Sequence, residues 1–244
     1  RLDRRIFGYT RVFDPEYFQA FLNWTDKLYG WTPKREDLFT SHGVIPALYE
    51  LTGYLCKSDE KVLMLTPSYA YFMHAAEHNN IGYVTSDLVN TKSDGYYEID
   101  FEDFERKATD PKVTLCIFCN PHNPSGRIWT EDELRRVAEI CFKHNVFIIS
   151  DEIHCDLIRS GQTHTPMAKL FPNSDQIITC MAPSKTFNMA GMQISNIVIP
   201  NEAVKKLWST YHNFDENPLS LAACQSAYES GYDWLVELRK YLDT

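Results

Sequence analysis

Lys185 is the residue of this chain with the most specific potential for chemistry. It follows an apolar run and stands in the segment Ala182-Pro183-Ser184-Lys185. A lysine is usually a charged, solvated surface residue. An ammonium beside a second cation or in a dry pocket loses its proton easily, however, and the free amine is then a nucleophile or a base. The apolar and small neighbours of Lys185 favour such a dry pocket and therefore a reactive amine.

Four other segments follow apolar runs in the same way. Asp151 comes directly after the run 146–149, so its carboxylate emerges from the interior and needs a cationic partner. The residues of these segments that could do chemistry could also have purely structural roles. Asp is common as a helix N-cap, and Asn before Pro favours turns. The five segments are Ser41-His42-Gly43-Val44, Thr66-Pro67-Ser68-Tyr69, Asn120-Pro121-His122-Asn123-Pro124, Ser150-Asp151-Glu152-Ile153-His154 and Ala182-Pro183-Ser184-Lys185.

Apolar, β-branched runs alternate with amphipathic stretches along the chain. Several runs are continuously apolar, which is typical of strands in a sheet covered on both faces. Thr130 and Glu133 form a capping box that opens a helix ending at Asn145, and residues 48–55 and 202–211 also have helical spacing. This alternation predicts an α/β fold with a mostly parallel, doubly wound sheet, whose ligands bind at the carboxyl ends of the strands. Strands are expected at 38–40, 62–65, 83–89, 113–118, 146–149, 177–179 and 194–199.

Several other chemistries are excluded by residues that are missing or misplaced. Residues 151–154 resemble the metal-binding box of helicases, but the chain has no Gly-Lys-Ser/Thr loop to hold phosphates. It also lacks a G-x-G-x-x-G fingerprint and the G-x-S-x-G turn of hydrolases. Cys116 and Cys119 form a C-x-x-C, but residues three apart on a strand point to opposite faces. No metal site is therefore expected.

The composition is that of an acidic globular chain. Its 244 residues include 24 basic and 33 acidic side chains, for a formal net charge of −9. A net negative surface gains nothing from nucleic acid or an anionic membrane, so neither is expected as a partner. No apolar run approaches the roughly 18 residues that span a bilayer, and no signal peptide is visible. The seven cysteines, an odd number, fit a reducing compartment, so the expected location is cytoplasmic.

Three motifs, in order and at fitting separations, carry a resemblance to a known family. They are Asn123-Pro124-Ser125-Gly126, Ser150-Asp151-Glu152 and the run 182–188. The chain resembles the fold-type I pyridoxal-phosphate enzymes of the class I/II aminotransferase family. More narrowly, it resembles the cystathionine β-lyase/cysteine-sulfur lyase branch, through Phe7-Gly8-Tyr9-Thr10 and the runs 121–129, 150–154 and 184–188. The resemblance implies a three-layer α/β/α sandwich with a mostly parallel sheet of seven strands, and pyridoxal 5′-phosphate as the cofactor.

The resemblance implies a role for each matched residue at that cofactor. Lys185 would bind the cofactor aldehyde covalently and, once released by substrate, remove the Cα proton. Asp151 would keep the pyridine nitrogen protonated, and Asn123 would donate a hydrogen to the phenolic oxygen. Tyr69 would stack on the ring. The phosphate would be held by amides at a helix N-terminus, by a hydroxyl next to the lysine and by a tyrosine of the other subunit: Gly43, Val44, Ile45, Ser184 and Tyr9.

Two positions depart from the usual transaminase pattern. His154, a further expected cofactor-binding residue, stands where the broader family has a tyrosine against the phenolic oxygen, although a plain core or surface histidine is the alternative. Gln193 stands where many aminotransferases have a phosphate-binding arginine. Both departures favour a carbon–sulfur β-lyase that converts L-cystathionine or a related cysteine S-conjugate to thiol, pyruvate and ammonia. The alternatives are a class I/II aminotransferase and a non-catalytic regulatory domain of the same fold.

The resemblance also implies how the protein is divided. Residues 1–230 are expected to form the large cofactor-binding domain, and residues 231–244 to begin the helix that leads to a C-terminal small domain absent from this chain. In the family, that small domain carries the arginine that binds the substrate α-carboxylate, a two-point contact that lysine makes poorly. The expected assembly is a homodimer with its active site at the subunit interface and a small amino acid as substrate.

Overall fold

A computed structural model describes residues 8, 15–90, 95–212 and 214–244, and a seven-stranded sheet forms its centre. Each of the seven apolar runs identified in the sequence forms one strand, and the bounds differ from the expected ones by one or two residues. The strands are β1 (Leu38–Ser41), β2 (Lys61–Thr66), β3 (Gly82–Asp87), β4 (Val113–Cys119), β5 (Phe147–Asp151), β6 (Ile177–Met181) and β7 (Ser195–Val198).

The sheet is mostly parallel, as the sequence predicts. Its strands lie in the order β1-β7-β6-β5-β4-β2-β3. The pairs from β6 through β5, β4 and β2 to β3 are all parallel. The exception is β7, which runs antiparallel to both of its neighbours, β1 and β6. Parallel strands need long crossover connections, and these are made by the helices that cover the two faces.

Alternate residues of the central strands point to opposite faces and enter different hydrophobic clusters. In β4, Ile117 and Cys119 belong to the cluster on one face, whereas Cys116 and Phe118 belong to the cluster on the other. All four side chains are buried, which explains why the strand is continuously apolar in sequence. The two cysteines of the C-x-x-C therefore lie on opposite sides of the sheet, as their spacing predicts, and cannot share a metal ion.

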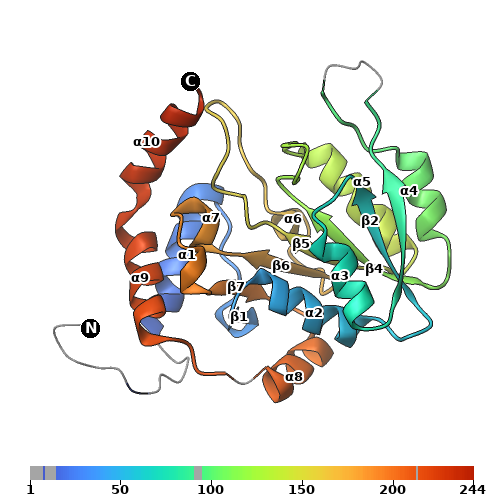
Figure 1. The fold of residues 1–244 in the computed structure, drawn as a ribbon, viewed down its shortest axis with the longest axis horizontal. Coiled ribbons are helices and arrows are strands. Elements are labelled where there is room, and N and C mark those ends of the chain that lie inside the picture. The colour runs from blue at the N-terminus through green and yellow to red at the C-terminus, as the bar shows by residue number, and fades with distance from the viewer. Residues whose placement is uncertain (1–7, 9–14, 91–94, 213) are drawn as a thin grey trace.

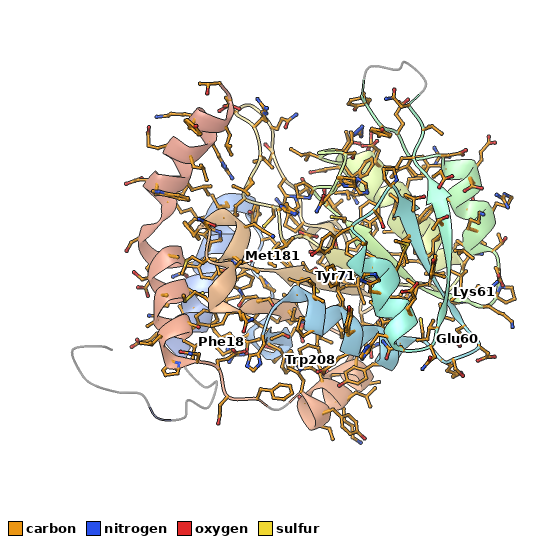
Figure 2. All side chains as sticks on the ribbon, viewed as in Figure 1. Phe18, Glu60, Lys61, Tyr71, Met181 and Trp208 are labelled. Atoms are coloured by element: carbon orange, nitrogen blue, oxygen red, sulfur yellow. The ribbon has the colours of Figure 1, made fainter. Side chains whose placement is uncertain are left out.

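Helices cover both faces of the sheet, so the fold is the expected three-layer α/β/α sandwich (Figure 1). Trp208 of α8 (Glu202–Tyr211) is buried where this helix meets α2 (Val44–Leu55) (Figure 2). One face carries α2 (Val44–Leu55), α3 (Tyr71–His78) and α8 (Glu202–Tyr211). The other carries α4 (Phe101–Ala108), α5 (Glu131–Lys143) and α6 (Met167–Leu170).

Three helices lie along one end of the sandwich: α1 (Pro15–Tyr29), α9 (Pro218–Ser230) and α10 (Tyr232–Leu242) (Figure 1). Phe18 of α1 (Figure 2) is buried in a third cluster with Leu221 of α9 and Leu235 of α10. The short α7 (Pro183–Thr186) and two 3-10 turns, Arg35–Asp37 and Ala190–Met192, complete the described elements. No helix in the described ranges is long and apolar enough to cross a membrane.

The start of α5 shows how a local sequence signal is used to fix a helix. Thr130 is the N-cap, its hydroxyl accepts the N–H of Glu133, and the Glu133 carboxylate accepts the N–H of Thr130. The same carboxylate binds the buried Arg127 guanidinium, at 2.6 and 2.8 Å from its Nη2 atom. The capping box predicted from the sequence is therefore confirmed, and it also ties α5 to the loop that follows β4.

Replacing Thr130 with Ala is expected to lower the free energy of unfolding by about 1 kcal/mol, because the N–H of Glu133 loses its acceptor. Urea denaturation monitored by circular dichroism measures the change. Thr163→Ala, at an exposed loop position, serves as the control and should stay within about 0.5 kcal/mol of the unaltered protein. Equal stability of the two variants would contradict the role given to the cap.

Candidate active site

A cavity of about 380 Å³ lies at the carboxyl ends of the strands. Its walls come from the segments that follow β1, β2, β4, β5 and β6, because parallel strands bring their carboxyl ends to the same edge of a sheet. Of the ten residues expected at the cofactor, Tyr9 lies outside the described residues. The other nine all line this cavity: Gly43, Val44, Ile45, Tyr69, Asn123, Asp151, His154, Ser184 and Lys185.

Asp151 ends β5 and presents a carboxylate at the floor of the cavity. Only 4% of the residue is exposed, and it stands in register between Cys119 of β4 and Cys180 of β6. Among the described residues, the one hydrogen bond to its carboxylate comes from the backbone N–H of Ile153, at 3.1 Å. The carboxylate thus keeps most of its acceptor capacity for a group inside the cavity.

The surroundings of Asp151 disfavour its charge. Burial is the main cause that raises its pKa to about 7, and the neighbouring charge of Glu152 adds to the effect. The N–H of Ile153 and the ammonium of Lys185 oppose the shift but do not cancel it. A cation placed against the carboxylate would remove this cost, which makes Asp151 a suitable partner for a protonated ring nitrogen.

Lys185 lies on α7, a single turn that begins with Pro183, and it lines the cavity. Its ammonium lowers the pKa of both Asp151 and His154, so the lysine lies close enough to influence the charge of both side chains. The sequence predicts a dry pocket around this lysine, and that expectation is wrong: Lys185 is exposed to solvent. The cavity is large enough to admit water around the amine, although the residues next to Lys185 in sequence are small or apolar.

His154 is half-buried on the wall of the cavity, three residues after Asp151. Burial, followed by the nearby charge of Lys185, lowers its pKa below the ordinary value of 6.5. The imidazole is therefore uncharged at neutral pH and offers one donor and one acceptor nitrogen. It does not act as a second cation beside the lysine.

Asn123 is carried by a tight loop that follows β4. Within this loop the N–H of His122 donates to the carbonyl of Arg127 at 2.7 Å, and the N–H of Gly126 donates back to the carbonyl of His122 at 2.8 Å. The backbone N–H of Asn123 donates to the thiol sulfur of Cys119 at 3.4 Å. These bonds hold the backbone on both sides of Asn123, so its amide side chain is presented to the cavity from a fixed position.

The first turn of α2 forms another wall. Gly43 is the N-cap, with φ of +122°, a backbone angle that residues with a side chain rarely adopt. No side chain caps this helix, and the amides of Gly43, Val44 and Ile45 precede Pro46, which has no N–H. Because the first amides of a helix lack intrahelical acceptors, these three N–H groups are available to an anion. Ser184 lines the same cavity.

Tyr69 provides an aromatic wall. Its ring lies 5.2 Å from that of Tyr71 and 5.9 Å from that of Phe72, centroid to centroid. Phe72 is buried in the core, whereas Tyr71 (labelled in Figure 2) is 39% exposed. Burial, then the neighbouring Tyr71 and Asp151, raises the pKa of the Tyr69 phenol, so it remains protonated at neutral pH. Its flat face is suited to stacking on a planar ligand.

Two wall residues with an imidazole or a thiol, His42 and Cys119, were not among the residues expected at the cofactor. His42 Nε2 lies 3.3 Å from the buried carboxylate of Glu216, in the segment between α8 and α9. Only the fold brings these two together, although the position of His42 directly before Gly43 was a usable signal. Cys119 was considered as a metal ligand and excluded; it is buried, and it reaches the cavity because it is the last residue of β4. Gln193 also lines the cavity, at the position noted for its missing arginine.

Taken together, the groups on the cavity wall fit the cofactor implied by the resemblance. The buried Asp151 carboxylate, with no cation hydrogen-bonded to it among the described residues, suits a protonated pyridine nitrogen. The uncapped amides of α2 suit a phosphate dianion. Tyr69 suits a planar ring and Lys185 an aldehyde.

Comparison with known proteins gives the family. The model of the family described as aminotransferase class I and II matches residues 3–228. The chain belongs to this family. It is 40% identical over 248 residues to cystathionine β-lyase PatB of Bacillus subtilis, covering all of this chain and 63% of that protein. It is 30% identical to protein MalY of Escherichia coli, covering 99% of this chain and 62% of MalY.

A solved structure of the family matches the fold described above. The PLP-bound C-S lyase from Staphylococcus hominis superposes with a TM-score of 0.97 at 51% sequence identity, covering all of this chain and 62% of that one. The present chain therefore spans 62–63% of the length of these three family members. This match agrees with the α/β fold and the seven-stranded, mostly parallel sheet expected from the sequence.

Replacing Asp151 with Asn is expected to change how the stability of the cofactor-free protein depends on pH. A buried carboxyl with a raised pKa contributes stability that is complete below about pH 4 and is lost as the pH rises through about 7. Asn cannot ionise, so between pH 5 and 8 the free energy of unfolding of the variant should rise relative to that of the unaltered protein, by on the order of 2–4 kcal/mol. Melting temperatures across this range measure the gain.

Asp59→Asn, on the exposed turn after α2, is the matched control for loss of a carboxylate. Its stability difference from the unaltered protein should stay constant over the same pH range. A difference for Asp151→Asn that is also independent of pH would contradict the argument that burial disfavours the charge of Asp151.

Proposed function

We propose that this protein is a pyridoxal 5′-phosphate-dependent carbon–sulfur β-lyase that cleaves L-cystathionine or related cysteine S-conjugates. The observation that carries the proposal is the match over the whole chain to a PLP-bound C-S lyase at 51% identity. The names of two further relatives support it, cystathionine β-lyase PatB at 40% identity and a cystathionine β-lyase of Corynebacterium glutamicum at 28%. His154, in place of the usual tyrosine, agrees with this branch of the family.

The residues that would hold the cofactor are those that line the cavity. Asp151 would keep a proton on the ring nitrogen, and its own carboxyl, with a pKa near 7 when unpaired, would ionise fully against that charge. Asn123 and His154 would bind the phenolic oxygen, and Tyr69 would stack on the ring. The amides of residues 43–45, with Ser184 and Tyr9 of a second subunit, would bind the phosphate.

When bound, pyridoxal 5′-phosphate supplies an electron sink conjugated to the amino group of the substrate. Lys185 Nζ then acts as the base that removes the Cα proton. The electron pair of that C–H bond forms the Cα–Cβ double bond, and the Cβ–S bond breaks with its electron pair on sulfur. A thiolate is a good leaving group because its conjugate thiol has a pKa of only about 8.5. Hydrolysis of the remaining aminoacrylate yields pyruvate and ammonia.

An aminotransferase is the second candidate. The family model bears that description, and an aspartate aminotransferase of Geobacillus stearothermophilus is 28% identical over 81% of this chain. Both reactions begin with removal of the Cα proton, for which Lys185 is equally suited. They differ in whether the Cβ–S bond then breaks.

We propose the same division and assembly that the resemblance implies. Residues 1–230 would form the cofactor-binding domain, and α10, within residues 231–244, would begin the connection to a smaller domain. The greater length of the relatives supports this division. The protein would be a cytoplasmic homodimer acting on a small amino acid, and its seven buried, free cysteines agree with a reducing compartment.

Incubation of the full-length protein with L-cystathionine should release pyruvate without any added keto acid. Pyruvate is measured by coupling to lactate dehydrogenase. A transaminase would instead need a keto acid as acceptor and would release no pyruvate from this substrate. Amino transfer without pyruvate would therefore replace the lyase proposal by the second candidate.

After incubation with pyridoxal 5′-phosphate and removal of the unbound cofactor, the protein should retain a visible absorbance band that Lys185→Ala lacks, because retention relies on covalent attachment to that amine. Lys206→Ala, at an exposed position of α8, is the matched control and should keep the band at full height. An unchanged band in Lys185→Ala would remove Lys185 from the proposed mechanism.

A further inference from the structure

Another buried carboxylate, Asp156, lies five residues after Asp151 and does not line the cavity. Only 2% of Asp156 is exposed. Its carboxylate accepts the indole N–H of Trp24 at 3.2 Å to each oxygen, the hydroxyl of Thr186 at 2.7 Å, and the phenol of Tyr29. Three side chains from two separate helices, α1 and α7, therefore converge on this one residue.

The hydrogen bonds identify Asp156 as an acceptor. An indole N–H can only donate, and it donates to both carboxylate oxygens. The phenol of Tyr29 is also a donor, because burial and then the charge of Asp156 raise its pKa well above the ordinary value. A buried carboxylate is costly unless its lone pairs are satisfied. Here the three uncharged donors satisfy them, together with a weak fourth donor, the thiol of Cys155 at 3.8 Å. Removing any one donor leaves part of the acceptor capacity of this buried carboxylate unsatisfied, which is costly.

Thr186 is the link between this cluster and the cavity, because it directly follows Lys185 on α7. The turn is only four residues long, and no side chain caps its N-terminus. Thr186 is fully buried, whereas Lys185 is exposed in the cavity. Successive helical residues point about 100° apart. Fixing the Thr186 side chain on Asp156 therefore fixes the rotation of the turn, and with it the direction in which Lys185 leaves the backbone.

The rest of the cluster makes Asp156 a rigid anchor. The guanidinium of Arg239, on α10, donates from Nε to the backbone carbonyl of Asp156 at 2.9 Å. The ring of Phe187, directly after Thr186, lies 5.5 Å from Trp24 and 5.7 Å from Trp234. The base of α7 is thus held between α1 and α10, and the one hydrogen bond from α7 to this anchor is that of Thr186 among the described residues.

We propose that Asp156 is a positioning residue for Lys185 and acts through the hydroxyl of Thr186. It holds the amine where an aldehyde bound in the cavity can reach it, although Asp156 itself touches neither the cavity nor its contents. Functional side chains need such support behind them to be held in productive geometry. The inference rests on the proposed function, since it takes Lys185 as the amine that binds the cofactor.

The test is a graded series at Thr186, with the rate of covalent attachment of pyridoxal 5′-phosphate as the readout. Attachment is followed by the visible band and by mass spectrometry after borohydride reduction. Thr186→Ser keeps the hydroxyl and should attach the cofactor within about threefold of the unaltered rate. Thr186→Val keeps the shape but loses the donor, and should attach it at least tenfold more slowly. Thr186→Cys, with a weak donor, should fall between them.

Thr179→Val controls for the loss of a buried hydroxyl as such. Thr179, on β6, is fully buried, and its hydroxyl has no hydrogen-bond partner among the described residues. This variant should attach the cofactor at the unaltered rate. Urea denaturation of each cofactor-free variant separates a change in attachment rate from a change in folding. If Thr186→Val does not fold, Thr186→Ser and Thr186→Cys still compare a strong with a weak hydrogen-bond donor at this position.

The outcomes separate this inference from the proposed function. If the unaltered protein forms no visible band, the proposed function fails. If the unaltered protein forms the band and the Val and Cys variants attach the cofactor as fast as Ser, the positioning role of Asp156 is overturned. A rate that follows the donor strength of residue 186, with Thr179→Val unaffected, supports it.

Discussion

The site depends on the cost of burying the Asp151 carboxylate. Its position at the end of β5, between two strands that are themselves covered on both faces, removes it from water. A single backbone N–H does not compensate for that loss, and the pKa near 7 is the consequence. Among the described residues, the Ile153 N–H and the Lys185 ammonium only partly offset this cost, so a further cation beside the carboxylate would stabilise its charged form. The other groups on the cavity wall lie around this carboxylate, where they can contact a ligand that carries such a cation.

The parallel direction of the strands brings other functional groups to the edge of the sheet where Asp151 lies. Because β2, β4, β5 and β6 are parallel, the segments after them reach the same edge, and an aromatic ring, an amide, a carboxylate and an amine meet there. The reversed strand β7 follows α7 and the turn at Gln193, and returns the chain away from the cavity. The amine is thus carried by a short turn between two antiparallel strands, and its orientation depends on side-chain contacts behind that turn.

Much of this was available from the sequence. The continuous apolar runs gave strand positions within two residues, since each run is buried on both faces. The capping box of Thr130 and Glu133 marked the start of α5, because its partners lie three residues apart. Short-range patterns of this kind can be recognised from spacing alone. The nine described residues expected at the cofactor share one cavity because each lies at the end of a strand or within the few residues that follow one.

Contacts between distant segments could not be predicted in this way. His42 and Glu216 are far apart in the chain, and nothing in their local sequence marks them as partners. The solvent exposure of Lys185 also depends on the cavity as a whole, so the small and apolar residues beside it in sequence were a misleading guide. Spacing identified which residues reach the edge of the sheet, whereas their surroundings required the fold.

The three acidic residues between 151 and 156 show why residue type alone does not decide a role. Glu152 is fully buried and accepts from Ser150, from the N–H of Met167 and, at 2.8 Å, from His164 Nε2, so its acceptor capacity is used inside the protein. Asp156 is likewise satisfied, by the side chains of Trp24, Tyr29 and Thr186 and by the thiol of Cys155. Asp151 accepts from one donor among the residues that the structure describes. Since a buried carboxylate must be compensated, the residue with the fewest internal donors is the one left to bind a ligand, and the other two are left to hold the structure around it.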